Sequence, residues 1–547
     1  MIDEGTVPWP EDLAYAYRTA DCWRGRPLGA YLWDWADAWG DHVAVVDGDR
    51  RLTYRELAVL SDGLAEQLIE HGLRRGDSVL VQLPNCWEFV VVTLACFRAG
   101  VVPVMMLPQH RAHELTAIAG HVEARALVVP DTWRGYDHQA LAHQVAAGLP
   151  DGAAVLVVGA DVRPHSVDVR SLMRCGGDVE ARRRRLDGLA PSAADVALFL
   201  LSGGTTAVPK VIARTHDDYE YNIRRCADVC RFSRQTVYLA VLPVGHNFPL
   251  ANPGVLGTLH RGGRVVMLPS PRPEQAFAAI EAEGVTATSV VPAVAIRWME
   301  AVDGSGRDLS SLRHIHVGGS MLSPEVAGAI GPALGCELQQ VYGMAEGLVC
   351  YTPVDAPRSV ANTTQGRPLS PFDELLVVHP MTGRPVPPGA VGELLVRGPY
   401  TPRGYYRAPE QNAVSYTPDG WYRTGDLVRI TPRGNLVVCG RVKDVINRAG
   451  EKISAAEIET LAQDIPDVAE AAAVSVPDAV VGERVCLVVR LHPGRELTLD
   501  RVAAALTERG LATFKVPERL VVLDDLPHTP LGKPDKKALR LLLTRAA

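Results

Sequence analysis

Short apolar runs alternate with longer amphipathic segments over residues 1–350, and this alternation limits the fold more than any other feature. The segment LAVLSDGLAEQLIEHGL (57–73) has the spacing of an amphipathic helix. The runs with the length and residue types of buried strands are SVLVQLP (78–84), ARALVVP (124–130), AAVLVVG (153–159), VALFLLS (196–202), RVVMLPS (264–270) and ATSVVP (287–292). Strands that alternate with helices predict an α/β fold, with parallel sheets covered by helices on their faces.

Near residue 365 the residue pattern changes to that of short strands separated by Pro- and Gly-rich turns, which predicts a smaller β unit. After GRVKDVINRAGEKIS (440–454) the pattern becomes a compact α+β unit that continues to the C-terminus. A chain of 547 residues is too long for one ordinary core. We therefore expect a boundary near residue 440.

Composition excludes several classes of partner. A net charge of −7 argues against a nucleic-acid-binding protein, and the run RRRR (182–185) predicts a solvated face, as charge runs usually do. The ten cysteines include no C-x-x-C pair, and Cys226 and Cys230 lack partners at zinc-site spacing. We interpret them as buried thiols in a reducing compartment.

No segment predicts a membrane partner or an export signal. The N-terminal stretch MIDEGTVPWPEDL is acidic and has no apolar centre, unlike a signal peptide. The apolar run FVVVTLACF (89–97) ends at Arg98 and is too short to span a bilayer. We therefore expect a cytoplasmic protein.

The stretch LSGGTTAVPK (201–210) directly follows a predicted strand. Its glycines and threonines offer backbone N–H groups and hydroxyls to an anion, with Lys210 as the counter-charge. Only seven of the 56 Lys and Arg residues are lysines, so each lysine is a candidate for a position that uses a compact, flexible ammonium, although some are kept by accident. The Walker A pattern is missing. The stretch predicts phosphate binding, although Gly-Gly and Thr-Thr alone fit an ordinary turn equally well.

Further stretches carry isolated polar groups at predicted turns. Glu346 in VYGMAEG (341–347) is a candidate ligand of Mg2+, and Tyr342 could stack on a purine. Asp426 in WYRTGDLVRI (421–430) could accept both ribose hydroxyls. The last two stretches are GRVKDVINRAGEKIS, with Arg441, Lys443 and Lys452, and TPLGKPDKKAL (529–539), with Lys533. Each stretch alone also fits a turn or a surface charge, but the five in this order are highly specific.

In this order the stretches make the whole chain resemble the adenylate-forming superfamily, which includes acyl-CoA synthetases, peptide-synthetase adenylation domains and luciferases. The chain is most similar to free-standing aryl-acid AMP ligases, which activate 2,3-dihydroxybenzoate or salicylate for siderophore and peptide-antibiotic assembly. The segments that carry this narrower match are SGGTTAVPKVIARTHDDYEYN (202–222), GHNFPLANPGVLGTLHRGGRVVMLPSP (245–271) and LQQVYGMAEGLVCYT (338–352).

The resemblance implies a fold and a two-step reaction. Residues 1–440 would form a large AMP-binding domain of two α/β sheet subdomains plus a small β-barrel-like unit. Residues 441–547 would form a small mobile α+β domain. The aryl carboxylate would attack the α-phosphate of ATP, bound with Mg2+, to give aryl-AMP and pyrophosphate. A phosphopantetheine thiol on an aryl carrier protein would then displace AMP.

The resemblance also implies roles for individual residues. Lys533 would bridge the carboxylate and phosphate oxygens, His246 would belong to the catalytic group, and Glu346 would bind the metal. Lys443 would be the hinge about which the C-terminal domain rotates for the second step. The nucleotide site would comprise Ser202, Gly203, Gly204, Thr205, Thr206 and Lys210 at the β- and γ-phosphates, Gly318, Gly319, Val341, Tyr342, Gly343 and Met344 at adenine, and Asp426 and Arg441 at ribose.

The implied aryl pocket comprises Asn247, Phe248, Asn252, Met321 and Val349. Asn252 departs from the family pattern, which has a small Ser or Cys there. Its amide offers a donor and an acceptor, which favours a ring with an added polar group, such as a hydroxy- or amino-substituted benzoate or a picolinate. Alternatively, Asn252 turns away and bonds to backbone. A second departure is Ala207, where the family usually has Gly.

Three other functions stay open at this point. An aryl-CoA ligase that uses free coenzyme A has the same fold, and its turnover without carrier protein would identify it. A nucleotide-binding module without catalysis is opposed by the presence of Lys533, Asp426 and Glu346. A P-loop kinase or ATPase is the weakest alternative, because the Walker pattern is missing.

Overall fold

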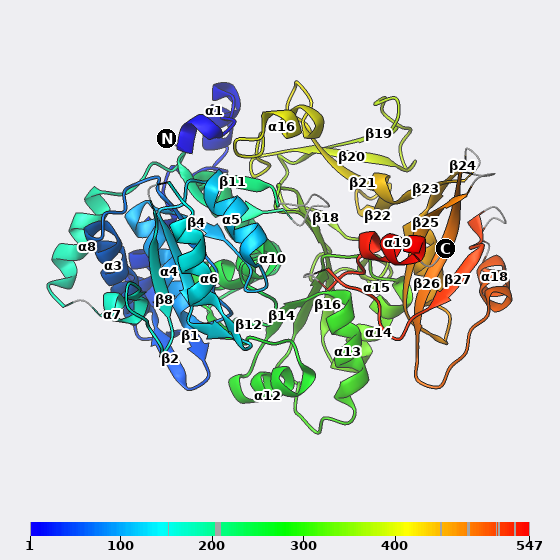
Figure 1. Ribbon diagram of the computed structural model, residues 1–547, viewed down its shortest axis with the longest axis horizontal. Helices are drawn as coiled ribbons and strands as arrows, with labels where there is room; N and C mark the ends of the chain where they lie inside the picture. The colour runs from blue at the N-terminus through cyan, green and yellow to red at the C-terminus, as the bar shows by residue number, and fades with distance from the viewer. Residues whose placement is uncertain are drawn as a thin grey trace.

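The computed structural model describes residues 2–150, 152–174, 176–202, 209–448, 451–478, 482–509, 511, 515–529 and 532–545. Two large sheets and a four-stranded sheet form the part of the chain before residue 442, and a five-stranded sheet follows. Figure 1 shows the residues after β22 gathered at one end of the molecule, far from helices α3 and α8. The predicted α/β class, with a large N-terminal part and a smaller C-terminal part, is confirmed.

The nine-stranded sheet draws its strands from distant parts of the sequence. Its central strands β1, β13, β12, β14, β15 and β16 are parallel, and antiparallel strands complete both edges. Its order is β18 (Arg367–Pro368), β17 (Val349–Tyr351), β16 (Glu337–Gly343), β15 (His314–Gly318), β14 (Ala287–Val290), β12 (Val237–Ala240), β13 (Arg264–Met267), β1 (Val43–Asp47) and β2 (Arg50–Thr53).

The seven-stranded sheet is parallel except for β11, which pairs antiparallel with β10. Its order is β11 (Val211–Thr215), β10 (Val196–Leu201), β4 (Val102–Met105), β3 (Ser78–Val81), β5 (Ala126–Pro130), β8 (Ala154–Val158) and β9 (Val167–Asp168). A short hairpin joins β6 (Thr132–Trp133) to β7 (Tyr136–Asp137).

Helices cover both sheets and fill the space between them. The helices before residue 200 are α1 (Glu11–Thr19), α2 (Tyr31–Trp39), α3 (Tyr54–Glu70), α4 (Trp87–Ala99), α5 (Ala112–His121), α6 (His138–Ala147), α7 (Val169–Met173) and α8 (Val179–Gly188). Those that follow are α9 (His216–Val229), α10 (Asn247–Ala251), α11 (Gly254–His260), α12 (Pro273–Glu283), α13 (Pro292–Val302), α14 (Pro324–Leu334), α15 (Arg358–Ala361) and α16 (Pro409–Ser415). Short 3-10 turns lie at Ile2–Gly5 and Leu28–Ala30.

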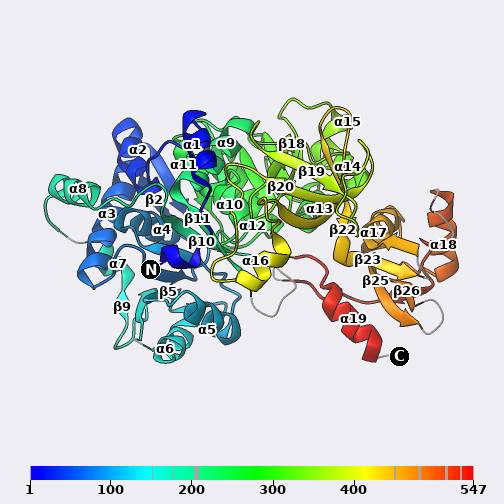
Figure 2. The same ribbon diagram turned by 90° about the horizontal axis from the view of Figure 1, so that it is seen from above.

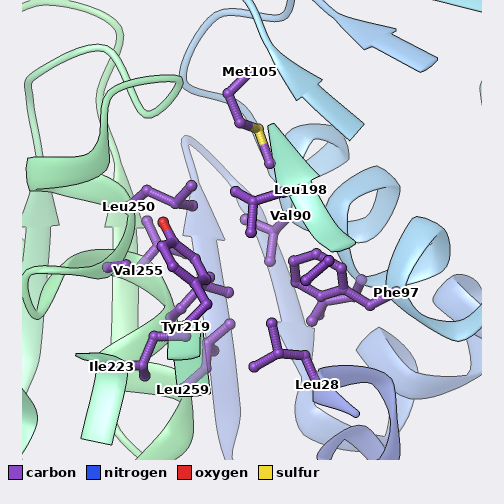
Figure 3. Packing of buried hydrophobic residues seen from close by; sticks show 14 of the residues in the cluster. Leu28, Val90, Phe97, Met105, Leu198, Tyr219, Ile223, Leu250, Val255 and Leu259 are labelled. Atoms are coloured by element: carbon purple, nitrogen blue, oxygen red, sulfur yellow. The ribbon is translucent and has the colours of Figure 1, made fainter. Parts of the chain in front are cut away.

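The largest core cluster lies where α4, α9 and α11 pack together. Residues 88–99 of α4 are all buried, so the apolar run 89–97 forms a core helix. Figure 3 shows Val90 and Phe97 of this helix on one side of the cluster and Tyr219, Val255 and Leu259 on the other. Among the described residues, no helix is both long and apolar enough to cross a membrane.

The expectation of a solvated arginine run is wrong for Arg182. This residue lies on α8, its side chain is 4% exposed, and it pairs with Glu66 of α3 at 2.6 Å. The expected burial of the thiols of Cys226 and Cys230 is confirmed.

Two smaller sheets follow the large ones. The antiparallel four-stranded sheet, which is the predicted small β unit, has the order β19 (Glu374–Val378), β20 (Gly392–Arg397), β21 (Tyr422–Ile430) and β22 (Leu436–Arg441). A 3-10 turn over Val442–Asp444 leads into the last sheet, of order β24 (Glu451–Ser454), β23 (Val445–Arg448), β26 (Gly482–Leu491) and β25 (Val468–Asp478), with β27 (Arg519–Val522) on β26. Its helices are α17 (Ala455–Gln463), α18 (Leu499–Glu508) and α19 (Lys536–Arg545).

Candidate active site

The carboxyl ends of parallel strands β15 and β16 form one wall of the candidate site, where ligands of open α/β sheets usually bind. Gly318 pairs in register with Val341, and a Cβ on Gly318 would lie 2.8 Å from the Val341 carbonyl oxygen. Gly319 has φ +89°, which favours glycine. The close approach of the two strand ends therefore requires Gly318, and the turn that follows requires Gly319.

Tyr342, Asp426 and Arg441 form a hydrogen-bonded group beside this wall. Asp426 of β21 pairs in register with Arg441 of β22. The Arg441 Nε donates to one carboxylate oxygen of Asp426 at 2.8 Å, and the Tyr342 hydroxyl donates to the other at 2.8 Å. Asp426 is only 6% exposed. The structure thus joins three predicted nucleotide-site residues from separate stretches, with the Tyr342 hydroxyl engaged by a carboxylate.

Lys533 reaches the same place from the C-terminal sheet. Burial and the charge of Arg441 lower the pKa of Lys533 to about 8, against the opposing effect of Asp426. The charge of Lys533 also helps to lower the pKa of His246 to about 3, after burial and His110. Lys533 therefore lies within electrostatic range of residues from three parts of the chain before residue 442.

Val291 shows where the Lys533 segment contacts the N-terminal part. A Cβ on Gly532 would lie 4.0 Å from Cγ2 of Val291, and a Cβ on Gly319 would lie 3.4 Å from Cγ1 of the same residue. Figures 1 and 2 both show the coil before α19 extending from the C-terminal sheet toward the green strands of the large sheet. The C-terminal part is thus closed on the N-terminal part with Lys533 at the contact.

Tyr405 links two predicted functional residues. Its hydroxyl donates to Oε1 of Glu346 at 2.8 Å, and the Lys210 Nζ lies 4.8 Å from the centre of its ring. Glu346 is 8% exposed. Lys210 ends the stretch that is predicted to bind phosphate, and its backbone N–H donates to the Ser202 hydroxyl at 3.1 Å. The other predicted loop residues, Gly203, Gly204, Thr205 and Thr206, lie outside the described residues.

His246 and Asn247 present unpaired buried groups at the start of α10. His246 is the N-cap residue of the helix, and its lowered pKa means that the ring is neutral at physiological pH. The Oδ1 of Asn247 accepts a 2.8 Å hydrogen bond from the Tyr219 hydroxyl. The Nδ2 of Asn247 and the Nε2 of His246 are buried and have no partner among the described residues. Buried polar atoms of this kind usually bind a ligand or water.

Asn252, which follows α10, has a side-chain orientation fixed by a relay of hydrogen bonds. The Nδ2 of Asn222 donates to the Ala251 carbonyl oxygen at 3.3 Å and to the Oδ1 of Asn252 at 2.9 Å. Since a backbone carbonyl can only accept, Asn222 presents its NH2 group and Asn252 presents its oxygen. The Cys226 thiol also donates to this oxygen, at 3.5 Å.

This relay has two consequences for Asn252. Its side-chain oxygen bonds to the side chains of Asn222 and Cys226, so the bond to backbone expected in the alternative interpretation is not formed among the described residues. Its Nδ2 has no hydrogen-bond partner among the described residues. Asn252 is 4% exposed, so this buried side chain can offer a ligand only a hydrogen-bond donor.

The remaining predicted residues lie close to these groups. Phe248 of α10 approaches the large sheet, since a Cβ on Gly318 would lie 3.4 Å from its Cζ. Val349 is fully buried and pairs with Gly343 across β16 and β17. Met321 and Met344 are partly exposed in the loops after β15 and β16. The backbone of Lys443 lies in the 3-10 turn Val442–Asp444, and its side chain is outside the described residues.

Sequence reasoning missed the residues that hold the predicted ones. Tyr219, Asn222 and Cys226 support Asn247 and Asn252 from one face of α9, at spacings of three and four residues. Figure 3 shows the Tyr219 ring inside the core cluster, with its hydroxyl oxygen on the side of Leu250. The available signal was the pair Tyr219 and Asn222 in THDDYEYN, three residues apart, followed by Cys226 after four more residues. Nothing in the sequence around Tyr405 indicated its contact with Glu346.

Known protein families match both the part of the chain that holds the large sheets and the C-terminal part. Residues 32–406 match the family of AMP-binding enzymes, and residues 457–533 match the AMP-binding enzyme C-terminal domain. A salicylyl-CoA synthase / salicylate adenylyltransferase from a Streptomyces species is 56% identical over 542 residues, which cover 99% of this chain and 98% of that protein. The 2,3-dihydroxybenzoate-AMP ligase of Bacillus subtilis strain 168 is 45% identical over 537 residues, 98% of this chain and 97% of that protein.

A solved structure extends this similarity to the fold. The apo structure of MbtA from Mycobacterium smegmatis has a TM-score of 0.76 and 45% sequence identity, and the match covers 99% of both chains. Similarity over nearly the full length of both chains includes the C-terminal part as well as the large sheets.

Proposed function

The chain belongs to the AMP-binding enzyme family and activates an aryl carboxylic acid with ATP. From this premise we propose which residues bind each substrate and which act in each step of the reaction. Residues 1–440 bind ATP and the acid, and residues 441–547 form a C-terminal domain that moves between two steps. In the first step an oxygen of the aryl carboxylate attacks the α-phosphorus, and the bond to the leaving pyrophosphate breaks. The products are aryl-AMP and pyrophosphate.

The convergence of Lys533 on the Asp426–Arg441 pair carries this proposal. Lys533 comes from the C-terminal part, yet its pKa responds to the charge of Asp426 in residues 1–440 as well as to that of Arg441 at the boundary, and the adjacent Gly532 lies against Val291. A partly buried, positioned ammonium stabilises negative charge that develops on the carboxylate and phosphate oxygens. We assign the closed arrangement to the adenylating step, with Lys533 as the catalytic cation.

Different groups of residues around this cation bind the ribose, the adenine and the phosphates of ATP. Asp426, held by Arg441 and Tyr342, accepts hydrogen bonds from the ribose hydroxyls. The close-packed glycines at the ends of β15 and β16 make room for adenine, together with Val341 and Met344. The β- and γ-phosphates bind at Ser202, Lys210 and the intervening loop, which holds Gly203, Gly204, Thr205 and Thr206.

Glu346 has the properties of a ligand for Mg2+. Its carboxylate is buried and accepts one hydrogen bond from Tyr405 at 2.8 Å, so further lone pairs stay available to a hard cation. A magnesium ion bound there would neutralise phosphate charge. Tyr405 fixes the carboxylate and also holds the Lys210 ammonium near it.

The unpaired amides beside α10 define the aryl site. The Nδ2 of Asn247 donates to an ortho substituent of the ring, and neutral His246 lies next to it with a second unpaired nitrogen. Phe248, Met321 and Val349 form apolar walls. Because Asn252 offers only a donor, the ring carries a hydrogen-bond acceptor opposite it, which a hydroxyl, methoxy or ring nitrogen supplies and an amine supplies poorly.

In the second step a thiol sulfur attacks the acyl carbon of aryl-AMP, forms a thioester and expels AMP. The C-terminal domain rotates about Lys443 and withdraws Lys533 before this attack. The acceptor is the phosphopantetheine of an aryl carrier protein, as in siderophore and peptide-antibiotic assembly. Free coenzyme A is the second candidate, because the name of the 56% identical Streptomyces relative includes a salicylyl-CoA synthase activity.

The test is ATP–pyrophosphate exchange with a panel of substituted benzoates and picolinates. Salicylate or a related ortho-hydroxy acid should exceed benzoate by at least ~100-fold in kcat/KM, because benzoate leaves the Asn247 donor unpaired. Exchange with none of the acids would refute aryl activation. Competition between coenzyme A and a phosphopantetheinylated carrier protein for the pre-formed aryl-AMP then identifies the acceptor.

A further inference from the structure

Residues 527–529 and 532–535 are the two described arms of the hairpin that carries Lys533. The Thr529 N–H donates to the Lys533 carbonyl oxygen at 2.7 Å, and the Asp535 N–H donates to the Pro527 carbonyl oxygen at 2.7 Å. Gly532 has φ +74° within the turn, a conformation that favours glycine. These bonds fix Lys533 relative to the hairpin, so the position of Lys533 depends on how the hairpin is attached to the rest of the domain.

Apolar residues attach the two ends of the hairpin to the C-terminal core. Leu526 precedes it and is 2% exposed, and Leu539 in α19 follows it and is fully buried in the same cluster. Between these anchors the hairpin extends away from the sheet toward the N-terminal part (Figures 1 and 2). The α19 anchor includes an ion pair of Lys536 with Glu459 of α17 at 2.8 Å. With these two anchors alone, the hairpin would be able to tilt about the line that joins them.

His528 supplies a third point of attachment. Its Nε2 lies 2.6 Å from Oε1 of Glu470 on β25, and its backbone faces Pro534, the residue next to Lys533. Glu470 also lies 3.7 Å from Arg490 of β26, and Asp525 has an oxygen within 4.8 Å of both Glu470 and His528. Among the described residues of 527–535, His528 is the one whose side chain hydrogen-bonds to the sheet.

We propose that His528 and Glu470 are positioning residues for adenylation, which prevent the hairpin from tilting and so hold Lys533 at the reacting oxygens. The inference rests on the proposed role of Lys533. A misplacement of about 1 Å can lower a rate ~100-fold even when the chemistry is distant. In the proposed second step Lys533 is withdrawn from the site, so the pair should matter in the first step only.

The experiment measures both half-reactions of the full-length enzyme for His528→Leu, His528→Gln, Glu470→Gln and Lys533→Ala. We expect His528→Leu to lower kcat for pyrophosphate exchange ~10- to ~100-fold with KM values nearly unchanged. His528→Gln, which keeps a donor for Glu470, should lose less. Thioester formation from supplied aryl-AMP should stay near wild type. Glu518→Gln, which removes the negative charge of the 2.8 Å pair with Arg448 elsewhere in the domain, is the matched control for Glu470→Gln and should affect neither step.

The double variant His528→Leu/Lys533→Ala decides whether His528 acts through Lys533. It should be no slower in adenylation than Lys533→Ala alone. An additional loss in the double variant, an equal loss in thioester formation or an unchanged exchange rate in His528→Leu would each overturn the inference. If Lys533→Ala itself left exchange unchanged, the proposed role of Lys533 would fail first, so the two failures are distinguishable.

Discussion

Replacement of Asn252 by leucine tests the hydrogen-bond polarity of the aryl site. The two side chains have similar shapes, but leucine has no donor. The Nδ2 of Asn252 has no partner among the described residues, and the side chain is 4% exposed. A substrate with an acceptor opposite this group gains a hydrogen bond, and one without an acceptor leaves a buried donor unpaired.

The expected discrimination follows from the cost of that unpaired donor. A buried polar group left unsatisfied costs about 1–3 kcal/mol, which corresponds to about 5- to 150-fold in kcat/KM. Methoxy and ethyl substituents have nearly the same shape and differ in the acceptor oxygen. We therefore expect wild type to prefer the methoxy member of a methoxy/ethyl pair of salicylates by at least ~5-fold at one ring position.

The assay is pyrophosphate exchange with methoxy- and ethyl-salicylates substituted at each ring position in turn. Asn252→Leu should abolish the preference by weakening activation of the methoxy acid. Asn252→Asp keeps an oxygen for Asn222 and replaces the donor by a second oxygen, so it should also remove the preference. Equal use of methoxy and ethyl acids by wild type at every position would refute the assignment of Asn252 as a donor in the pocket.

Three further predictions concern the catalytic groups. Lys533 is charged below its pKa of about 8, so kcat/KM for exchange should be level below pH 8 and fall tenfold per pH unit above it, and Lys533→Arg should move this limb to higher pH. Tyr405→Phe removes the hydroxyl that holds Glu346 and should lower kcat/KM for Mg-ATP by ~10-fold, and a value equal to wild type would contradict its role. Lys443→Pro should spare pyrophosphate exchange and abolish transfer to the carrier protein; near-normal transfer would exclude residue 443 as the hinge.

Local signals in the sequence predicted individual elements well. The helix expected over 57–73 is α3, Tyr54–Glu70, and its earlier start follows from a capping box in which Thr53 and Glu56 bond reciprocally. This signal was readable in the sequence. The apolar runs at 78–84 and 196–202 also became the strands expected of them, because burial in a parallel sheet requires continuous apolar residues.

Contacts between distant segments could not be predicted from local patterns. Strand β1 pairs with β13, more than 200 residues later, and nothing in the period of either strand specifies the other. Arg182 pairs with Glu66 because α8 packs on α3, which a run of four arginines does not indicate. The partners of Glu346, Asn247 and Asn252 are buried polar residues whose roles depend on this packing. The prediction that Asp426, Arg441 and Lys533 belong to one site came from the resemblance to a family and not from periodicity.

The most direct test of the account compares the two half-reactions in Lys533→Ala. Loss of one preorganised charge should lower aryl-acid-dependent pyrophosphate exchange by at least ~100-fold, while thioester formation from supplied aryl-AMP stays near the wild-type rate. That result would show that Lys533 acts in the adenylating step, which the closed arrangement represents. Equal losses in both half-reactions, or full exchange activity without the lysine, would contradict the assignment of this site and the proposed domain rotation.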